Sequence, residues 1–172
     1  MLLRKSCYTF AVEQQIITDM KHCWMIIFAL LVALDAVSQS NRIYVEPFEI
    51  CPDSIVAVPV MLANESPTRG LQFNMTLPEG LVVDDCEITK YCDKYNMSLF
   101  TNRNGDVWTI GMYPMGAICL PANTAAIVTL QMLARPTFKG GEIIVWKCRG
   151  STIDNMTIYM DGDTTAVTVT PF

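Results

Sequence analysis

The stretch Ile55–Val83, IVAVPVMLANESPTRGLQFNMTLPEGLVV, decides the fold class. Apolar residues recur at every second position from Val56 to Leu62 and again from Leu71 to Leu77. An alternation of period two places one set of side chains on each face of a β-strand. The polar segment 64–70 joins the two runs, and Pro78-Glu79-Gly80 ends the second. The stretch therefore predicts two strands, each with one buried face.

Two details refine this hairpin. Pro59 lies inside the first strand and has no N–H to donate, which predicts a sheet edge or a bulge there. The second strand alternates most regularly, with Phe73 at its centre. We expect its apolar residues to specify the core and its polar half to face solvent.

Further short runs of apolar and β-branched residues predict strands along the rest of the chain. They lie near residues 43–45, 81–83, 97–101, 107–113, 124–134, 142–148, 153–160 and 164–170. Asn104-Gly105 predicts a hairpin turn because both positions tolerate positive φ. Segments 84–96 and 114–123 are interpreted as irregular surface loops, and no helix is predicted. About nine or ten short strands predict an all-β antiparallel two-sheet sandwich, of jelly-roll or immunoglobulin type.

The N-terminal segment has the pattern of a secretory signal over residues 20–38. Met20-Lys21-His22 precedes an apolar run of about a dozen residues, and the small residues Ala36 and Ser38 follow it. A bilayer span needs about 20 apolar residues, so we expect export without stable membrane insertion after cleavage. This prediction places the protein outside the cell, in a periplasm or at the cell surface.

Residues 1–19 fit poorly in front of such a signal. Glu13 and Asp19 lie upstream of the positive start that a signal peptide requires. We therefore expect translation to start at Met20, with residues 1–19 a mis-assigned start or an extension. The remaining 41–172 have the length of one domain.

Charge argues against nucleic acid as a partner. The chain carries 12 Lys and Arg against 17 Asp and Glu, a formal charge of −5. The acidic residues are dispersed and no basic stripe is present, whereas nucleic-acid-binding surfaces concentrate positive charge.

Cysteines and histidines limit the chemistry of metal sites. Signal cleavage would leave an odd set of cysteines, which implies one unpaired thiol or an intermolecular bond. These are Cys51, Cys86, Cys92, Cys119 and Cys148. A disulfide between Cys86 and Cys92 is one interpretation, and small buried thiols are the other, favoured for Cys148. His22 would leave with the signal, so a Cys/His zinc site is excluded and no metal or other cofactor is predicted.

Catalysis has little support in the sequence. Without a histidine in the mature chain, Ser-His and Cys-His nucleophiles are missing, and no enzyme is predicted. The acidic residues of one segment are interpreted as solvated charges: Glu79, Asp84, Asp85 and Glu87. Asp161-Gly162-Asp163 matches a turn better than a calcium site.

Aromatic residues and sequons bear on glycans. The strand aromatics are favoured as core residues, and outward display of two or more in a row would instead indicate sugar binding: Trp108, Tyr113, Trp146 and Tyr159. Asn-x-Ser/Thr sequons start at Asn64, Asn74, Asn96 and Asn155. They are incidental in a bacterial exported protein and mark glycosylated surface in a eukaryotic one.

The order of motifs resembles a known family. A Val56-Ala57-Val58-Pro59-Val60 strand precedes a polar turn, the Phe73-centred strand and Pro78-Glu79-Gly80-Leu81. Asn104-Gly105, a long Ala/Ile/Val strand, a Gly-Gly turn and a closing Thr/Val strand follow. Over about residues 43–170 this pattern resembles a cohesin domain, in particular the variant of secreted Bacteroidetes proteins. The resemblance implies a jelly-roll sandwich of about nine strands, related to carbohydrate-binding modules.

The resemblance also implies a function. Cohesins bind a dockerin helix pair on one sheet face, which would come here from the strands at 70–77, 97–101, 107–113 and 142–148. The outward candidates are Gln72, Asn74, Thr76, Thr109 and Tyr113. Asn74 departs from the family, which has an acidic residue there.

These observations predict an exported, non-catalytic binding module for a protein partner, and the resemblance implies a dockerin-bearing one. One alternative is a carbohydrate-binding module of a polysaccharide-degrading system. The other is a structural component of a surface assembly linked through the odd cysteine.

Overall fold

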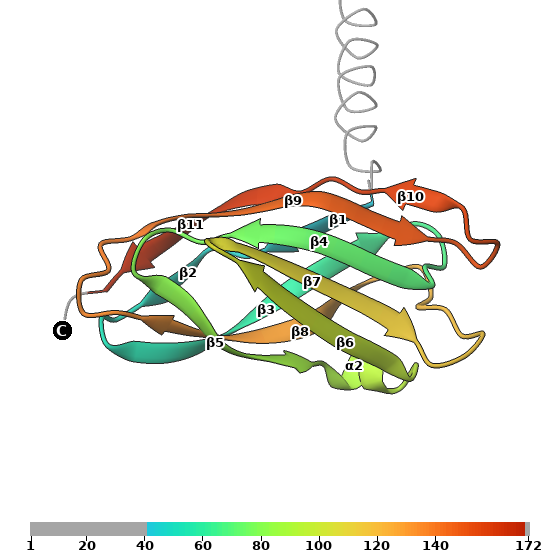
Figure 1. Ribbon diagram of the computed structural model, residues 1–172, viewed down its shortest axis with the longest axis horizontal. Coiled ribbons are helices and arrows are strands. Elements are labelled where there is room, and N and C mark those ends of the chain that lie inside the picture. The colour runs from blue at the N-terminus through green and yellow to red at the C-terminus, as the bar shows by residue number, and fades with distance from the viewer. Residues whose placement is uncertain (1–40, 171–172) are drawn as a thin grey trace, which may run out of the picture. The chain divides into compact units, whose positions relative to one another are not determined.

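The computed structural model describes residues 41–170, which form two packed β-sheets (Figure 1). The predicted signal peptide at 20–38 and the predicted extension at 1–19 lie outside the described residues. The smaller sheet has the strand order β1-β3-β8-β5, and the larger has the order β2-β11-β9-β4-β7-β6, with β10 paired to β9. The prediction of an all-β sandwich is confirmed.

The strands of the smaller sheet are β1 (Arg42–Val45), β3 (Ser54–Asn64), β5 (Leu81–Ile88) and β8 (Asn123–Ala134). Those of the larger sheet are β2 (Phe48–Ile50), β4 (Gly70–Thr76), β6 (Met97–Asn104), β7 (Val107–Pro114), β9 (Gly141–Ser151), β10 (Thr157–Tyr159) and β11 (Asp163–Val169). All pairings are antiparallel except that between β11 and β2.

The prediction of a hairpin over Ile55–Val83 is wrong, because β3 and β4 do not pair with each other and lie in different sheets. The core fills the space between the sheets and follows the predicted alternation. In β4, Leu71, Phe73 and Met75 are buried, whereas the residues between them are only half-buried. Pro59 in β3 also matches its prediction. It pairs with Thr129 of β8, while β1 pairs with β3 only from Val60 onward, and a register shift follows at Val60/Met61. Pro59, which has no N–H to donate, therefore lies beside a bulge at a point where β1 no longer pairs with β3.

One margin of the sandwich is closed by hydrogen bonds between the two sheets. The Ile43 N–H donates to the Asp161 carbonyl at 2.9 Å. The hydroxyl of buried Thr165 in β11 donates to the Val45 carbonyl at 2.6 Å. Along the opposite margin, β5 and β6 are the outermost strands of their sheets, and no backbone hydrogen bond joins them within residues 41–170.

The segment 84–96 differs from the prediction of an irregular loop. Strand β5 continues to Ile88, because a register shift between Val83 and Asp85 turns the two acidic residues outward without ending the strand. A short helix, α2 (Lys90–Asp93), follows. The Thr89 hydroxyl caps it by accepting from the Cys92 N–H at 3.4 Å. The charges of this segment therefore lie on regular structure.

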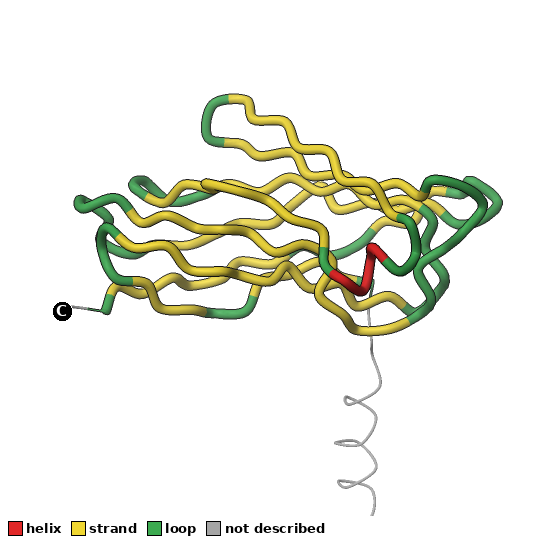
Figure 2. Tube along the Cα trace, turned by 90° about the horizontal axis from the view of Figure 1, so that it is seen from below, coloured by secondary structure: helices red, strands yellow, loops and turns green. Residues whose placement is uncertain are grey.

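The β6–β7 hairpin turns one residue later than predicted. Asn104 is the last residue of β6 and pairs with Val107, so Gly105-Asp106 forms the loop. Only Gly105 of these two has a positive φ, of 62°. Glycine at the first loop position alone is the pattern of a type II′ rather than a type I′ turn. Figure 2 shows the tip of a hairpin standing away from the rest of the sandwich.

Candidate functional site

The four strands that we predicted to form a binding face are neighbours in the larger sheet. They are β9, β4, β7 and β6, in that order across the sheet. One side of these strands packs on the core. The opposite side is the candidate site, which we call the outer face.

The polar half of β4 lies at the centre of the outer face. Gln72, Asn74 and Thr76 alternate with the buried residues of β4, so their side chains point outward. Asn74 lies opposite Thr109 of β7, and the Thr109 hydroxyl donates to Asn74 Oδ1 at 3.2 Å. Thr76 Oγ1 accepts from the indole N–H of Trp146 at 3.1 Å. The structure therefore brings these predicted residues together on neighbouring strands, where Asn74 and Thr76 each form a separate hydrogen bond.

Tyr113, the remaining predicted residue, belongs to an aromatic pair. Its side chain is 49% exposed and its ring centroid lies 6.3 Å from that of Phe100, which is 42% exposed. Phe100 is opposite Gly111, and its ring occupies the space above that glycine. A methyl group built on Gly111 would lie 2.0 Å from the Phe100 Cζ atom. Sequence reasoning missed Phe100, although a glycine inside the apolar run 107–113 is a sign of close approach.

A second group of large side chains comes from β9 and β10. Trp146 is opposite Asn74 and half-buried, and Ile144 is 43% exposed. A bulge at Lys147, where φ is 50°, keeps its ammonium 4.8 Å from the Trp146 ring centroid. Farther along β9, Arg149 lies between Gln72 on one side and Tyr159 of β10 on the other. Tyr159 is 83% exposed.

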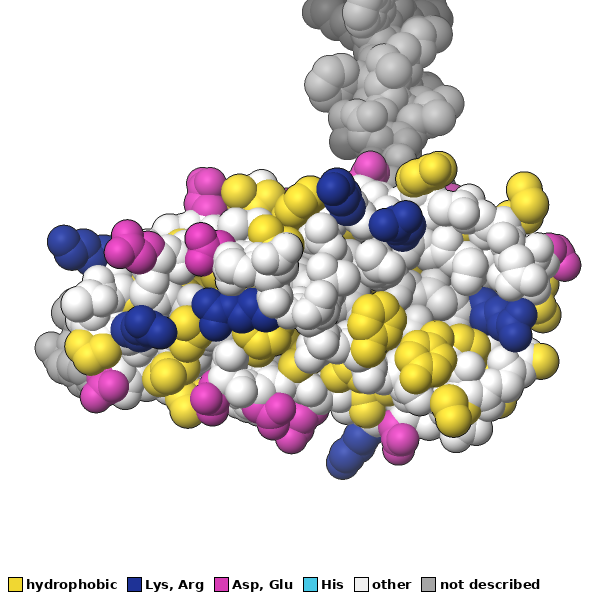
Figure 3. Space-filling view, in the orientation of Figure 1, with side chains coloured by type: hydrophobic (Ala, Val, Ile, Leu, Met, Phe, Trp, Pro, Cys, Tyr) yellow, Lys and Arg dark blue, Asp and Glu magenta, His cyan; other side chains and the backbone are white. Residues whose placement is uncertain are grey.

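The outer face thus combines apolar rings, a neutral polar centre and two cations. Figure 3, which views the molecule from this side, shows hydrophobic side chains gathered over β6 and β7. Of the four predicted strand aromatics, Trp108 is the one on the inward side of the sheet, since it alternates with Ile110 and Met112. The prediction of core positions is therefore wrong for Tyr113 and Tyr159, which are displayed to solvent, and for Trp146, which lies half-buried on the outer face.

The cysteines do not form the predicted Cys86–Cys92 disulfide in the structure. All five cysteines of the described residues are free thiols. Cys92 is fully buried in α2, whereas Cys86 is a half-buried residue of β5 opposite Leu130, so regular structure separates the two.

Burial raises the pKa of Cys86 to about 12, with a further contribution from the Asp85 carboxylate. Burial also raises the pKa of Cys92 to about 11, partly offset by its hydrogen bond with Thr89.

Metal-binding groups are not assembled in the described part of the chain. No cluster of three or more His, Cys, Asp or Glu side chains occurs within residues 41–170. At Asp161-Gly162-Asp163, a Cβ on Gly162 would overlap the Val145 carbonyl. The interpretation of the segment as a turn is wrong, because β10 and β11 both run antiparallel to β9 and follow it in the same direction, and the close contact at Gly162 lies in the short break between them.

The sequons differ in accessibility. Asn64 is 2% exposed, and its amide nitrogen donates to the carbonyls of Ser66 and Pro121. Asn74 is bonded to Thr109 in the outer face. Asn96 and Asn155 are exposed in positive-φ turns. Only the latter two are freely accessible.

No helix within residues 41–170 is long and apolar enough to cross a bilayer. A scan against known protein families and a search of curated proteins return no match for the sequence.

Solved structures do match the fold. The cohesin module of a family 33 glycoside hydrolase from Clostridium perfringens superposes with a TM-score of 0.64 at 6% identity, covering 78% of this chain and 100% of that one. The sixth cohesin of scaffoldin B from Acetivibrio cellulolyticus, solved in complex with a Cel5 dockerin, gives 0.61 at 12% identity, covering 76% and 99%. A non-cellulosomal cohesin from Archaeoglobus fulgidus gives 0.58 at 13% identity, covering 74% and 91%. The described residues of this chain therefore have the fold of cohesin modules.

Proposed function

We propose that the protein is a non-catalytic binding module that holds a protein partner on the outer face of β9, β4, β7 and β6. The observation that carries this proposal is the exposure of large apolar side chains around a neutral polar centre. Phe100, Tyr113, Ile144 and Tyr159 are each more than two-fifths exposed. Single exposed apolar residues are ordinary, but several on one sheet face are typical of an interaction surface.

The physical character of this face fits protein recognition. Interface cores are enriched in aromatic residues and arginine and depleted in acidic residues. The outer face follows this composition, with Phe100, Tyr113 and Trp146 as rings and Arg149 as the cation. The Thr109 hydroxyl and Asn74 Oδ1 already satisfy each other, so a partner that covers them needs to supply an acceptor only for the Asn74 amide N–H groups.

The comparisons support a helical partner of the dockerin class. The Acetivibrio cellulolyticus cohesin was solved with a dockerin, as was the Clostridium acetobutylicum cohesin CaCohA2. Asn74 stands where the cohesin pattern has an acidic residue, so the partner would present a neutral group rather than a cation at that point. The predicted signal at 20–38 places this binding outside the cytoplasm.

Affinity capture tests this proposal. The full chain, immobilised, is used to capture proteins from the material secreted by its host, in parallel with Phe100→Ala/Tyr113→Ala and Ile55→Ala variants. Ile55 is the matched control, because it is 54% exposed on the other sheet. We expect one dockerin-bearing protein to be retained by the wild type and by Ile55→Ala and lost from the double variant. Retention by all three would show that the outer face is not the site.

Carbohydrate binding is the second candidate, because the Phe100–Tyr113 pair and Tyr159 supply the exposed rings on which sugars stack. Retention of the full chain on insoluble polysaccharides, abolished by Tyr159→Ala, would favour it. Capture of a protein without any glycan dependence would exclude it.

A further inference from the structure

A cleft opens where the β6–β7 hairpin stands away from the smaller sheet. Its volume is about 370 Å³. Three segments line it: the end of β4 with the start of β5, the hairpin, and Arg135 just after β8. Ligand pockets commonly enclose about 300–1,000 Å³, so the space suits a small molecule.

The hairpin residues of the cleft occupy positions that should belong to the core. Arg103 pairs with Trp108 across the hairpin. Arg103 is an even number of residues from buried Met97 on β6, and Trp108 is two residues from buried Ile110 on β7, so both side chains belong to the inward side of their strands. An arginine facing inward between two sheets would be costly in a closed sandwich. Here the lifted hairpin leaves Arg103 exposed and Trp108 half-exposed. A polar residue that breaks the inward pattern at an opening marks a functional position.

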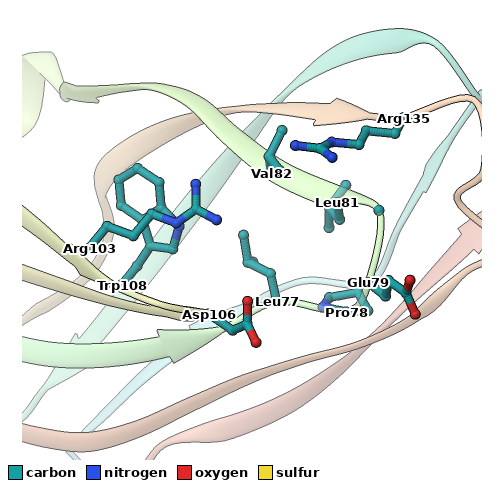
Figure 4. Close-up of a pocket in the computed structure, with 10 residues that line it drawn as sticks. Leu77, Pro78, Glu79, Leu81, Val82, Arg103, Asp106, Trp108 and Arg135 are labelled. Carbon is teal, nitrogen blue, oxygen red and sulfur yellow. The ribbon is translucent and has the colours of Figure 1, made fainter.

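The opposite wall supplies a second guanidinium. Arg135 is exposed, and its backbone is fixed by the bond from its N–H to the Gly80 carbonyl at 2.8 Å. Figure 4 shows the Arg103 and Arg135 side chains directed toward the same space, with Val82 between them. Leu77 and Leu81 add apolar surface to the lining.

Both guanidinium groups have donors to spare. Arg103 uses Nε to donate to the Gly105 carbonyl at 2.9 Å, and its guanidinium lies 5.8 Å from the Trp108 ring centroid. Among the described residues neither arginine forms an ion pair, although Glu79 and Asp106 also line the cleft. Figure 4 shows the Glu79 carboxylate pointing away from the two arginines.

We propose that this cleft binds a small organic carboxylate with a ring as its body. A carboxylate matches the planar fork of a guanidinium in a bidentate pair, and two guanidinium groups can share its oxygens. The ring would lie on the apolar lining beside Trp108. Because Glu79 and Asp106 also line the cleft, a polyanion such as triphosphate would meet more repulsion there than a single carboxylate. This site is independent of the outer face and of its partner.

Titration of the full chain with matched probes tests the proposal. The probes are glucuronate against glucose and benzoate against benzamide, followed by Trp fluorescence and by NMR of the Trp108 indole, with inorganic triphosphate as the polyanion. We expect at least one carboxylate to bind at least tenfold more tightly than its neutral partner and than triphosphate. The sugar pair and the benzene pair distinguish a sugar acid from an aromatic acid.

Variants locate the site. Arg135→Gln should weaken carboxylate binding at least tenfold, because its side chain has no other bond to lose. Arg103→Gln should act similarly, but it also removes the bond to Gly105, so Arg135→Gln is the decisive variant. Lys90→Gln, an exposed cation on α2, is the control and should bind normally. Equal binding of acid and neutral probes, unchanged binding by Arg135→Gln, or no saturable binding up to about 10 mM would overturn the proposal.

Discussion

The outer faces of the two sheets differ in the size and the charge of the side chains they display. The larger sheet exposes Phe100, Tyr113, Ile144 and Tyr159 on this side, whereas the smaller sheet exposes one large apolar residue, Ile55. The charges near the middle of the two faces also differ in sign, although Glu142 of β9 and Arg42 of β1 lie toward the ends of their faces with the opposite sign. The larger sheet carries Lys147 and Arg149 over the middle of its outer face, and the smaller sheet carries Asp85 and Glu87 along β5.

Both sheets obey the same alternation of inward and outward residues, so folding alone does not explain this difference. A solvated sheet face needs only small or polar outward residues, and the smaller sheet has them at Ala57, Thr129 and Gln131, although Ile55 and Leu133 form an apolar pair there. Its outermost strand β5 is also bulged and acidic, which protects an edge from unwanted pairing. The large rings and cations of the other face add nothing to the core. The proposed contact with another molecule would explain their position, and the following changes test it.

The largest expected effect comes from removing the aromatic pair. Phe100→Ala/Tyr113→Ala should weaken binding of the captured partner by at least about 100-fold, because central aromatic anchors each contribute about 2 kcal/mol or more. Isothermal titration calorimetry measures the change, with Ile55→Ala as the control expected to bind normally. Equal losses in both variants would mean that the two faces do not differ in function.

Displacing one ring should have a smaller effect. Gly111→Ala places a methyl group 2.0 Å from the Phe100 Cζ atom, so the ring must leave its position while the strand pairing remains. We expect about tenfold weaker binding, since the ring is exposed and can move into solvent. A double-mutant cycle with Phe100→Ala checks the cause: the combined variant should bind no worse than Phe100→Ala alone. Additive losses would show that Gly111 acts by another route.

Charge reversal tests the difference in sign between the faces. Arg149→Glu should slow association with an acidic or neutral partner by several-fold at low salt, and the difference should shrink as salt rises. Stopped-flow or surface plasmon resonance measures the association rate. Glu87→Lys on the smaller sheet is the matched reversal and should leave the rate unchanged. A salt-independent effect of Arg149→Glu would indicate a packing role instead.

The alternation in Ile55–Val83 was sufficient to predict both the core and the polar half of the outer face. Leu71, Phe73 and Met75 are buried, and Asn74 and Thr76 point outward, because inward and outward placement in a regular strand depends only on parity. The same rule failed at Asp84 and Asp85. Two adjacent charged residues predicted the end of a strand, because alternation would bury one of them. Instead, a bulge turns both outward and β5 continues.

The remaining errors depend on tertiary structure. Phe100 joins Tyr113 only through the register of β6 on β7. A turn at Gly105-Asp106, one residue later than predicted, moves the partner of Phe100 from Thr109 to Gly111. The cleft beside Arg103 depends on how far the hairpin rises from β5, which no local pattern encodes. Cys86 and Cys92 are free thiols. They lie on the second half of β5 and on α2, where the sequence predicted an irregular loop.

The acidic edge of the smaller sheet should also be visible in the pH dependence of stability, as the smallest effect. Burial first and Asp85 second raise the pKa of Cys86 from 9.0 to about 12. A group with a raised pKa stabilises the folded state below its unfolded pKa, and this stability is lost as pH rises toward the folded value. The free energy of unfolding should therefore fall between pH 8 and pH 10, where the unfolded thiol ionises and the folded one does not. Because Cys86 is partly exposed, its share should stay well under the about 1.4 kcal/mol that one pH unit represents.

Urea unfolding at both pH values should show a smaller fall in Cys86→Ser, whose hydroxyl does not titrate, while lysines and tyrosines contribute equally to both proteins. An identical fall in the two proteins would show that the Cys86 thiol ionises as readily in the folded chain as in the unfolded one.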